Sequence, residues 1–131
     1  MLGFCDIDHF KQFNDRHGHE TGDRVLRYVA AALARAFDGR GIVGRFGGEE
    51  FVVALPDMTL ADARAFIDAV RHKLAERHLY AATDNADLGS VAFSAGVTTL
   101  IDGDGSAELL RRTDEALYRA KAAGRNFVMI G

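Results

Sequence analysis

Two short acidic segments are the residues best suited to chemistry in this chain. Asp6 and Asp8 follow apolar residues at the start, and Glu49 and Glu50 follow a glycine pair. Mg²⁺ prefers hard oxygen ligands, usually one or two carboxylates completed by phosphate oxygens and water. Two such ions about 3.5 to 4 Å apart can activate an attacking hydroxyl and bind phosphates, as in polymerase-type phosphoryl transfer. If the fold brings both segments together, they predict a divalent-metal site.

A β-hairpin is expected to carry the second acidic segment. Residues 42–46 and 51–55 are strand-like, and Gly47 and Gly48 stand between them. This arrangement is typical of a tight primed turn, because glycine adopts the positive φ angles that such a turn needs. Taken alone, acids at this turn are better explained as ordinary solvent-exposed side chains. The apolar residues 1–7 predict a buried strand, and pairing it beside the hairpin, as in ferredoxin-like units, puts both acidic segments at one edge.

Helical spacing of apolar residues predicts four helices. The first is a short helix followed by a loop within residues 8–20. The others are expected to cover residues 21–38, 59–77 and 106–123. Asp8, Thr59 and Ser106 are the expected N-caps, because their side-chain oxygens can accept from free first-turn amides. Gly18 and Gly124 are expected to end the first and last helices, since glycine readily adopts the left-handed conformation found there.

The remaining apolar segments predict strands at residues 79–84, 88–100 and 127–130. The sequence Asp102 to Gly105 is predicted to be a plain loop, because no bidentate glutamate follows at calcium-loop spacing. Hairpins mixed with crossover helices indicate an α+β sandwich with a largely antiparallel central sheet flanked by helices.

Composition supports one globular domain. The chain has 131 residues, of which 48% are hydrophobic and 27% charged. No apolar run approaches the roughly 20 residues that span a bilayer, and a net charge of −3 argues against binding nucleic acid or an anionic membrane. The single Cys5 cannot form an internal disulfide, which favours a reducing, cytoplasmic location. We expect Cys5 to be a buried, unreactive side chain.

Five segments in order resemble one known family, the GGDEF-domain diguanylate cyclases. The segments are residues 6–15, 17–23, 45–51, 93–97 and 114–126. The central segment carries Gly-Gly-Glu-Glu-Phe, a common variant of the family signature, and the resemblance covers nearly the whole chain. It implies that residues 1–131 are a GGDEF domain with the nucleotidyl-cyclase-like form of the sandwich.

The resemblance also implies a reaction. Family members condense two GTP molecules into cyclic di-GMP and release two pyrophosphates, with Mg²⁺, or alternatively Mn²⁺, as cofactor. By this analogy Asp6, the backbone carbonyl of Ile7 and Glu49 bind the metal, and Glu50 adjoins it. Glu49 is also the family's candidate for taking the proton from the attacking 3′-hydroxyl, although metal activation of that hydroxyl could make a separate base unnecessary.

The resemblance to the family also implies which residues bind the substrate. The resemblance implies that Asn14 and Asp23 read guanine and that His19 contacts substrate, and an amide and a carboxylate do match the donors and acceptors of guanine. Local evidence alone favours simpler interpretations. Asp23 would be a first-turn helix acid, Asn14 a loop residue and His19 an exposed histidine.

Phosphate contacts form a second set. The backbone amides of His9, Phe10 and Lys11 begin a helix, where anions bind well. The side chains of Lys11, Lys121 and Arg125 match the family's triphosphate contacts, and the absence of a side chain at Gly48 would leave room for the nucleotide. Without the resemblance, Lys121 and Arg125 would be ordinary cations near a helix C-terminus.

Two departures from the family pattern lead to further expectations. The inhibitory Arg-x-x-Asp motif is replaced by residues 38–41, Asp-Gly-Arg-Gly, so we expect no product inhibition there. The Asp-x-Leu-Thr segment and sensory domain that usually precede the first strand are missing from the sequence, and a sensory domain is expected in the full-length protein.

One site holds one GTP, so catalysis is expected to need a transient homodimer. The alternative is a catalytically silent domain that binds GTP or cyclic di-GMP, and the least specific reading is a scaffold with no ligand.

Overall fold

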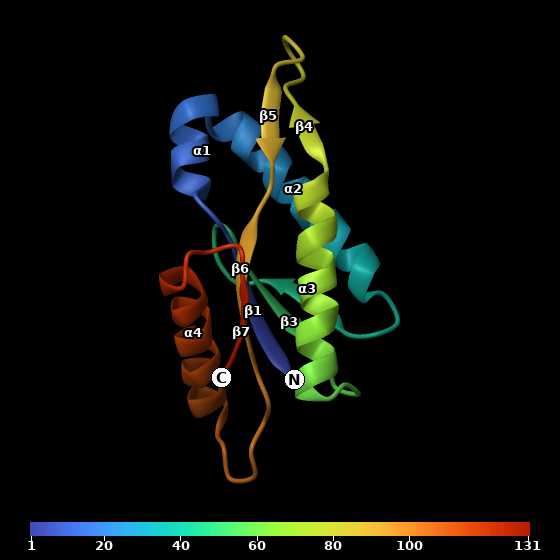
Figure 1. Cartoon of the computed structure of the whole chain (residues 1–131), viewed down its shortest axis with the longest axis vertical. Helices are drawn as coiled ribbons and strands as arrows, with labels where there is room; N and C mark the ends of the chain where they lie inside the picture. Colours follow the sequence, from blue (N-terminus) through green and yellow to red (C-terminus); the bar gives the residue numbers. More distant parts are fainter.

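The computed structural model describes residues 1–131. In chain order the elements are β1 (Leu2–Ile7), α1 (Phe10–His17), α2 (His19–Phe37), β2 (Ile42–Arg45), β3 (Glu50–Ala54), α3 (Leu60–Glu76), β4 (His78–Tyr80), β5 (Asp87–Ser90), β6 (Phe93–Thr98), α4 (Ser106–Ala122) and β7 (Val128–Ile130). Figure 1 shows them arranged as an α+β sandwich, which confirms the predicted fold class.

The central five-stranded sheet has the order β2-β3-β1-β6-β7. Its β2–β3, β1–β3 and β1–β6 pairs are antiparallel, and only β6–β7 is parallel. This agrees with the expectation of a largely antiparallel sheet. Although β1 comes first in the chain, it is the central strand, so hydrogen bonds on both sides fix its position and the position of the acidic segment at its end.

Helices cover both faces of this sheet, with α2 and α3 on one face and α4 on the other (Figure 1). The main core lies between the sheet and the α2–α3 layer. There Leu33, Phe37, Val53 and Ile67 have at most 1% of their surface exposed. Burial of such apolar side chains is the dominant stabilising term, and here it holds β1 against two helices.

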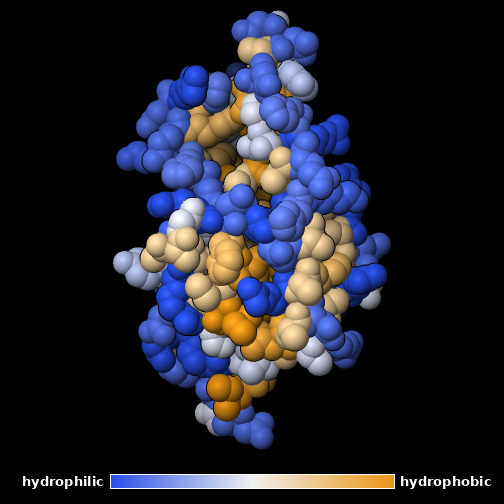
Figure 2. Space-filling model, in the orientation of Figure 1, coloured by the Kyte–Doolittle hydropathy of each residue, from blue (hydrophilic) through white to orange (hydrophobic).

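The molecular surface is mixed in character. In the orientation of Figure 2, hydrophilic side chains dominate the end that holds α1 and the β4–β5 pair, while apolar side chains gather over the opposite half. None of the helices combines the length and apolarity needed to cross a bilayer.

One predicted strand divides in two. Residues 88–100 form β5 and then β6, which belong to different sheets, because β5 pairs with β4 and β6 pairs with β1. The strand predicted at 79–84 is shorter and ends at Tyr80. The turn that follows explains this, since the Ala81 amide donates to the Ala86 carbonyl at 2.8 Å and the Ala86 amide donates to Asp84 Oδ1 at 3.1 Å.

Helix boundaries agree with the sequence at most ends. Thr59 caps α3 by accepting from the Asp62 amide at 3.1 Å, and Gly18 follows α1, as predicted. Two other predicted N-caps were wrong. Ser106 is the first residue of α4, and Gly105 before it is the cap and has no side chain to contribute. Asp8 does not cap α1, for a reason that lies in the site.

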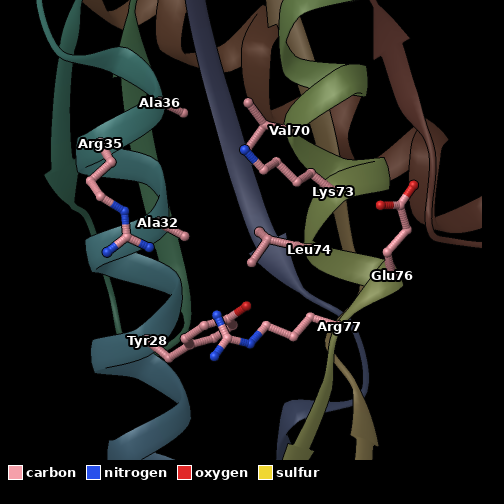
Figure 3. Close-up of a pocket in the computed structure, with 9 residues that line it drawn as sticks. All are labelled: Tyr28, Ala32, Arg35, Ala36, Val70, Lys73, Leu74, Glu76 and Arg77. Atoms are coloured by element: carbon pink, nitrogen blue, oxygen red, sulfur yellow. The ribbon is translucent and has the colours of Figure 1, made fainter.

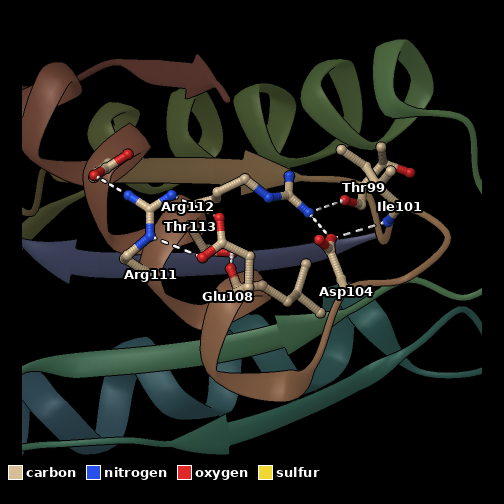
Figure 4. Close-up of polar contacts among 9 residues, drawn as sticks. Thr99, Ile101, Asp104, Glu108, Arg111, Arg112 and Thr113 are labelled. Carbon is tan, nitrogen blue, oxygen red and sulfur yellow. Dashed lines mark hydrogen bonds and ion pairs between the residues drawn. The ribbon is translucent and has the colours of Figure 1, made fainter.

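Ion pairs attach the loop before α4 to the first turns of that helix (Figure 4). Arg112 donates to the Thr99 carbonyl at 2.9 Å and pairs with Asp104. Asp104 also accepts from the Ile101 amide at 3.1 Å, and this hydrogen bond, with Arg112, lowers the pKa of Asp104 below its usual value. Neighbouring Arg111 bridges two glutamates of the same helix. These contacts fix the start of α4, whose far end reaches the candidate site.

Candidate active site

Residues from three separate segments of the chain meet at one small cavity. It lies where β1 leads into α1, beside the hairpin loop and the end of α4, and has a volume of about 150 Å³. Its lining consists of Asp6, Ile7, Asp8, His9, Phe10, Lys11, Gln12, Glu49, Lys121 and Arg125. Apart from Asp8 and Gln12, all of these were expected from the sequence as metal, catalytic or phosphate-binding residues.

A partly buried ion pair forms part of the cavity lining. Asp6 is 6% exposed, and Lys121 Nζ donates to Asp6 Oδ2 at 2.9 Å. A carboxylate removed from water needs an opposite charge or several hydrogen bonds, because its desolvation is costly. The ammonium of Lys121, which arrives from the last turn of α4, supplies that charge.

Glu50 adds a second carboxylate beside Asp6. The two residues face each other in the β1–β3 register. Burial raises the pKa of Glu50, the negative charge of Asp6 and a hydrogen bond with its side chain raise it further, and Lys121 opposes the shift. The local field is therefore negative enough to favour an additional cation.

The glycine pair does not form the predicted two-residue turn. Residues 46–49 connect β2 to β3, and neither Gly47 nor Gly48 has a positive φ angle. Arg45 holds this wider loop, because its Nε donates to the Gly47 carbonyl at 3.1 Å and its terminal nitrogen donates to the Gly48 carbonyl at 2.8 Å. The Phe46 and Gly47 amides also donate to the Glu50 carbonyl, at 2.9 and 3.3 Å. Side-chain and backbone hydrogen bonds together close this wider loop, and the φ requirement of a primed turn does not apply.

The same loop places Glu49 against the end of β1. The Ile7 amide donates to the Glu49 carbonyl at 3.2 Å, and the rings of Phe4 and Phe46 stack with centroids 5.1 Å apart. A Cβ atom built on Gly48 would have no heavy atom within 4 Å. The loop is therefore open on that side, as approach of a nucleotide would require.

The junction between β1 and α1 forms the opposite wall. His9 precedes α1 in a left-handed conformation, with φ of 57°, and no side chain caps the helix. The first amides of a helix have no partner within it, so those of Phe10 and Lys11 lie at the cavity with their hydrogen-bonding capacity available for an anion. The Lys11 side chain is exposed at the same wall.

Asp8 has a different task from the one predicted. Its carboxylate accepts from Ser94 Oγ at 2.7 Å and from the Asn126 amide at 2.8 Å, so it ties β1 to β6 and to the segment after α4. The prediction that Asp8 caps α1 was wrong because these two donors occupy its oxygens. Ser94 and Asn126 both lie inside segments that resemble the family, but spacing along the chain gave no signal that they meet.

The residues expected to read guanine lie outside this cavity. Asp23 is exposed and lines a neighbouring concavity of about 320 Å³ with Arg27 and Arg45. The Oδ1 atom of Asn14 is buried without a hydrogen-bond partner. A Cβ atom on Gly22 would lie 1.7 Å from that oxygen, so Asn14 in its present position packs against α2 where Gly22 has no side chain.

His19 is exposed as the first residue of α2 and does not line the small cavity either. The structure therefore brings most of the residues expected to bind metal and phosphate to one cavity, although Glu50 and Gly48 do not line it, and leaves the residues expected to read the base outside it.

The carboxylates fit a hard cation that keeps other ligands. No group of three or more histidine, cysteine or acidic side chains is arranged as a closed metal site. Asp6 and Glu49 nevertheless line one cavity, and Mg²⁺ is commonly held by one or two carboxylates plus phosphates and water. The donor chemistry of the residues thus suits a metal ion that binds together with a phosphate-bearing ligand.

A larger cavity lies elsewhere, between the C-terminal halves of α2 and α3 (Figure 3). Its volume is about 660 Å³, and Ala32, Ala36, Val70 and Leu74 give it apolar walls. None of the predicted site residues lines it, and Glu76 is its only acid. Size alone would select this cavity, but the paired carboxylates and cations are in the smaller one.

Family comparison agrees with the geometry. The family model described as diguanylate cyclase, GGDEF domain, matches residues 1–127. The chain therefore belongs to the GGDEF family, as the five matching segments predicted.

Curated relatives belong to longer proteins. The chain is 42% identical over 125 residues to the response regulator PleD of Caulobacter vibrioides, covering 95% of this chain and 27% of PleD. It is 38% identical to the diguanylate cyclase DgcP of Pseudomonas aeruginosa and 39% identical to the diguanylate cyclase VdcA of Vibrio cholerae, over 96% and 98% of this chain. It spans 18% of DgcP and 38% of VdcA.

Solved structures agree on the fold. The coiled coil and GGDEF domain of DgcB from Caulobacter crescentus, in complex with c-di-GMP, superimposes with a TM-score of 0.96 at 35% identity, over 99% of this chain and 68% of that one. The active GGEEF domain of a diguanylate cyclase from Vibrio cholerae gives a TM-score of 0.86 at 35% identity, over 98% and 80%.

Proposed function

We propose that this domain is a diguanylate cyclase that condenses two GTP molecules into cyclic di-GMP and releases two pyrophosphates. The observation that carries the proposal is the cavity in which Asp6 and Glu49 lie beside Lys121, Arg125 and the first amides of α1. Carboxylates for a metal and cations for a triphosphate in one place are what nucleotidyl transfer requires. The membership of the GGDEF family gives the reaction its identity.

In this mechanism the residues divide into three tasks. The carboxylates of Asp6 and Glu49, with the Ile7 carbonyl and Glu50 beside them, hold Mg²⁺ or Mn²⁺. When bound, the metal supplies Lewis-acid activation of the hydroxyl and charge neutralisation of the phosphates. Glu49 is also the candidate for accepting the proton of the 3′-hydroxyl.

The second task is triphosphate binding. The amides of His9, Phe10 and Lys11 and the side chains of Lys11, Lys121 and Arg125 bind it, and the open Gly48 admits the nucleotide. In the third task Asn14 and Asp23 read the guanine, with His19 contacting the substrate.

The chemistry needs two copies of the domain. The 3′-hydroxyl oxygen of one GTP attacks the α-phosphorus of the other, a new P–O bond forms, and the bond to the leaving pyrophosphate breaks while the hydroxyl proton is lost. A second, reciprocal step closes the ring. Because each domain holds one GTP, two domains must face each other in a transient homodimer.

The test is incubation of concentrated protein with GTP and Mg²⁺, followed by separation of the nucleotides. Wild-type protein is expected to make cyclic di-GMP, and Glu49→Ala is expected to make none. Equal product from both proteins would contradict the role of Glu49. Binding of GTP or cyclic di-GMP without turnover, even in an enforced dimer, would support instead a silent regulatory domain.

A further inference from the structure

Two consecutive residues at the rim of the cavity have an uncommon backbone conformation. Arg125 has φ of 65° and Asn126 has φ of 48°. A non-glycine residue in this left-handed region costs about 1–3 kcal/mol, so it persists only where surrounding contacts enforce it. Arg125 lines the cavity, and its exposed guanidinium makes no hydrogen bond or ion pair within the protein. The contacts that enforce this backbone conformation therefore determine the direction of the Arg125 side chain.

Contacts from α4 fix one side of this segment. The Arg125 amide donates to the Ala120 carbonyl at 3.2 Å, and the Gly124 amide donates to the Lys121 carbonyl at 3.3 Å. These are the two hydrogen bonds of a Schellman motif, with Gly124 at C′, as predicted for it. The motif ends the helix and fixes the backbone as far as Arg125, but it does not constrain Asn126.

Contacts from the sheet fix the other side. The Asn126 amide donates to Asp8 Oδ2 at 2.8 Å and to Ser94 Oγ at 3.1 Å. Its side chain is held as well, because a terminal nitrogen of Arg71 donates to Asn126 Oδ1 at 2.7 Å. Asn126 is thus held at both its backbone and its side chain.

Arg71 reaches this point from α3, across the edge of the sheet. It is 8% exposed, and its Nε donates to Asp68 Oδ1 at 2.8 Å. Arginine is rarely buried unless it is paired, and here its fixed, planar head connects an acid of its own helix to the segment after α4. Arg71 does not line the cavity, so any effect it has on a ligand must pass through Asn126 and Arg125.

We propose that Arg71 is a positioning residue of the nucleotide site, which holds Asn126 and thereby presents the Arg125 guanidinium to the triphosphate. The proposal rests on the proposed function, because it takes the phosphates as the ligand of Arg125. Its physical basis is preorganisation. A cation whose backbone is already fixed loses less conformational freedom when it binds, so more of its interaction energy appears as affinity.

A double-mutant cycle tests this route. The probe is a GTP analogue with a methylene group between the α- and β-phosphorus atoms, titrated calorimetrically with Mg²⁺ present. Arg71→Gln and Arg125→Ala are each expected to weaken binding roughly tenfold, and the double variant no more than Arg125→Ala alone. If the losses simply multiply, or if Arg71→Gln binds as tightly as wild type, Arg71 does not act through Arg125.

Matched variants separate positioning from general stability. Arg64→Gln changes an exposed arginine of the same helix and is expected to leave affinity unchanged. Arg71→Lys, which keeps one charged donor, is expected to recover part of the lost affinity. Asn126→Gly tolerates positive φ and removes only the side-chain acceptor, so it is expected to weaken binding as Arg71→Gln does, even if the latter folds poorly.

A measurement without nucleotide distinguishes this proposal from the proposed function. Amide hydrogen exchange at Asn126 is expected to be about tenfold faster in Arg71→Gln than in wild type, with exchange in the core of α2 unchanged. Unchanged exchange at Asn126 in a GTP-binding protein would overturn the positioning role alone. Wild-type protein that fails to bind the GTP analogue would overturn both the role and the proposed function.

Discussion

At the scale of single residues, the site is a concentration of negative charge with one internal cation. Asp6 is buried, Glu50 faces it across the strand pair, and Lys121 donates to Asp6. Lys121 has about a third of its side chain exposed, so its ammonium remains partly hydrated. The ion pair therefore compensates the charge of the buried Asp6 in the free protein.

Replacing Lys121 should destabilise the protein. Lys121→Met removes the charge that compensates Asp6, and a buried polar group left without its partner costs about 1–3 kcal/mol, or more when it is charged. We expect a lower midpoint of urea unfolding at neutral pH. Lys73→Met, an exposed lysine of α3 without an ion pair, is the matched control and should leave the midpoint unchanged. Equal midpoints for both variants would show that Asp6 does not depend on Lys121.

Cys5 should be chemically inert in the folded protein. It is 1% exposed, and burial, together with the charge of Asp6, raises the pKa of its thiol to about 12. Since the thiolate is the reactive form, iodoacetamide at pH 8 should label Cys5 at a rate set by unfolding. Mass spectrometry should find labelling in denaturant and almost none in buffer. Rapid labelling of native protein would mean that β1 is accessible.

At the scale of elements, α4 is the part that completes the site. It packs on β6 at Gly96, where a Cβ atom would lie 2.2 Å from the Leu117 nitrogen and 2.7 Å from the Thr113 carbonyl oxygen. A backbone approach this close is possible only for glycine. Because Lys121 and Arg125 are carried by the far end of α4, its distance from the sheet determines whether they reach the cavity.

Gly96→Ala should therefore disturb both stability and binding. The added methyl group forces α4 away from β6, and overpacking of this kind typically costs about 1–3 kcal/mol. Gly44→Ala is the control, because its Cβ would meet only a Val52 methyl group at 3.3 Å. Urea unfolding and GTP-analogue titration should both show a loss for Gly96→Ala that Gly44→Ala lacks. Similar values for the two variants would contradict the close-packing argument.

The connection between α2 and β2 should not bind product. Residues 38–41 lack the inhibitory motif, Gly39 has φ of 73°, and the Arg40 guanidinium lies over the Phe66 ring at 5.2 Å. Initial rates of synthesis should therefore not fall as cyclic di-GMP is added. Strong inhibition at low micromolar product, with hydrogen exchange slowed at residues 38–41, would contradict this prediction.

At the scale of the whole molecule, the cavity lies at one end of the central strand, open to solvent and formed by a single chain. One such site can bind and orient one nucleotide, while the reaction joins two. The proposed activity therefore requires two domains to meet. How often they meet depends on the protein concentration rather than on the fold of one domain.

Activity per protein should rise with protein concentration. If two domains must meet, the initial rate at saturating GTP is expected to grow about as the square of concentration when dimers are rare. Joining each domain to a parallel two-stranded coiled coil should remove this dependence and raise the rate at low concentration. A linear rate with the unfused domain would show that one copy suffices, or that stable dimers already exist.

Much of the fold could be predicted because it depends on local patterns. Apolar spacing located the helices, Thr59 and Gly124 marked their ends, and the acidic segments pointed to an oxygen-ligand site. The failures have two causes. Tertiary hydrogen bonds with Ser94 and Asn126 override the local capping role of Asp8. The glycine pair fails for a local reason, because Arg45, two and three residues before it, holds a wider loop than a two-residue turn.

The sequence by itself determined the family and the fold class and named candidate residues for metal and phosphate binding, because residue type and order along the chain carry that information. Only the tertiary structure decided that Lys121 pairs with Asp6, that β5 leaves the sheet joined by β6, and that Arg71 reaches Asn126. These contacts join residues up to 115 positions apart. No local propensity specifies such pairs, since they exist only once burial has packed the helices against the sheet.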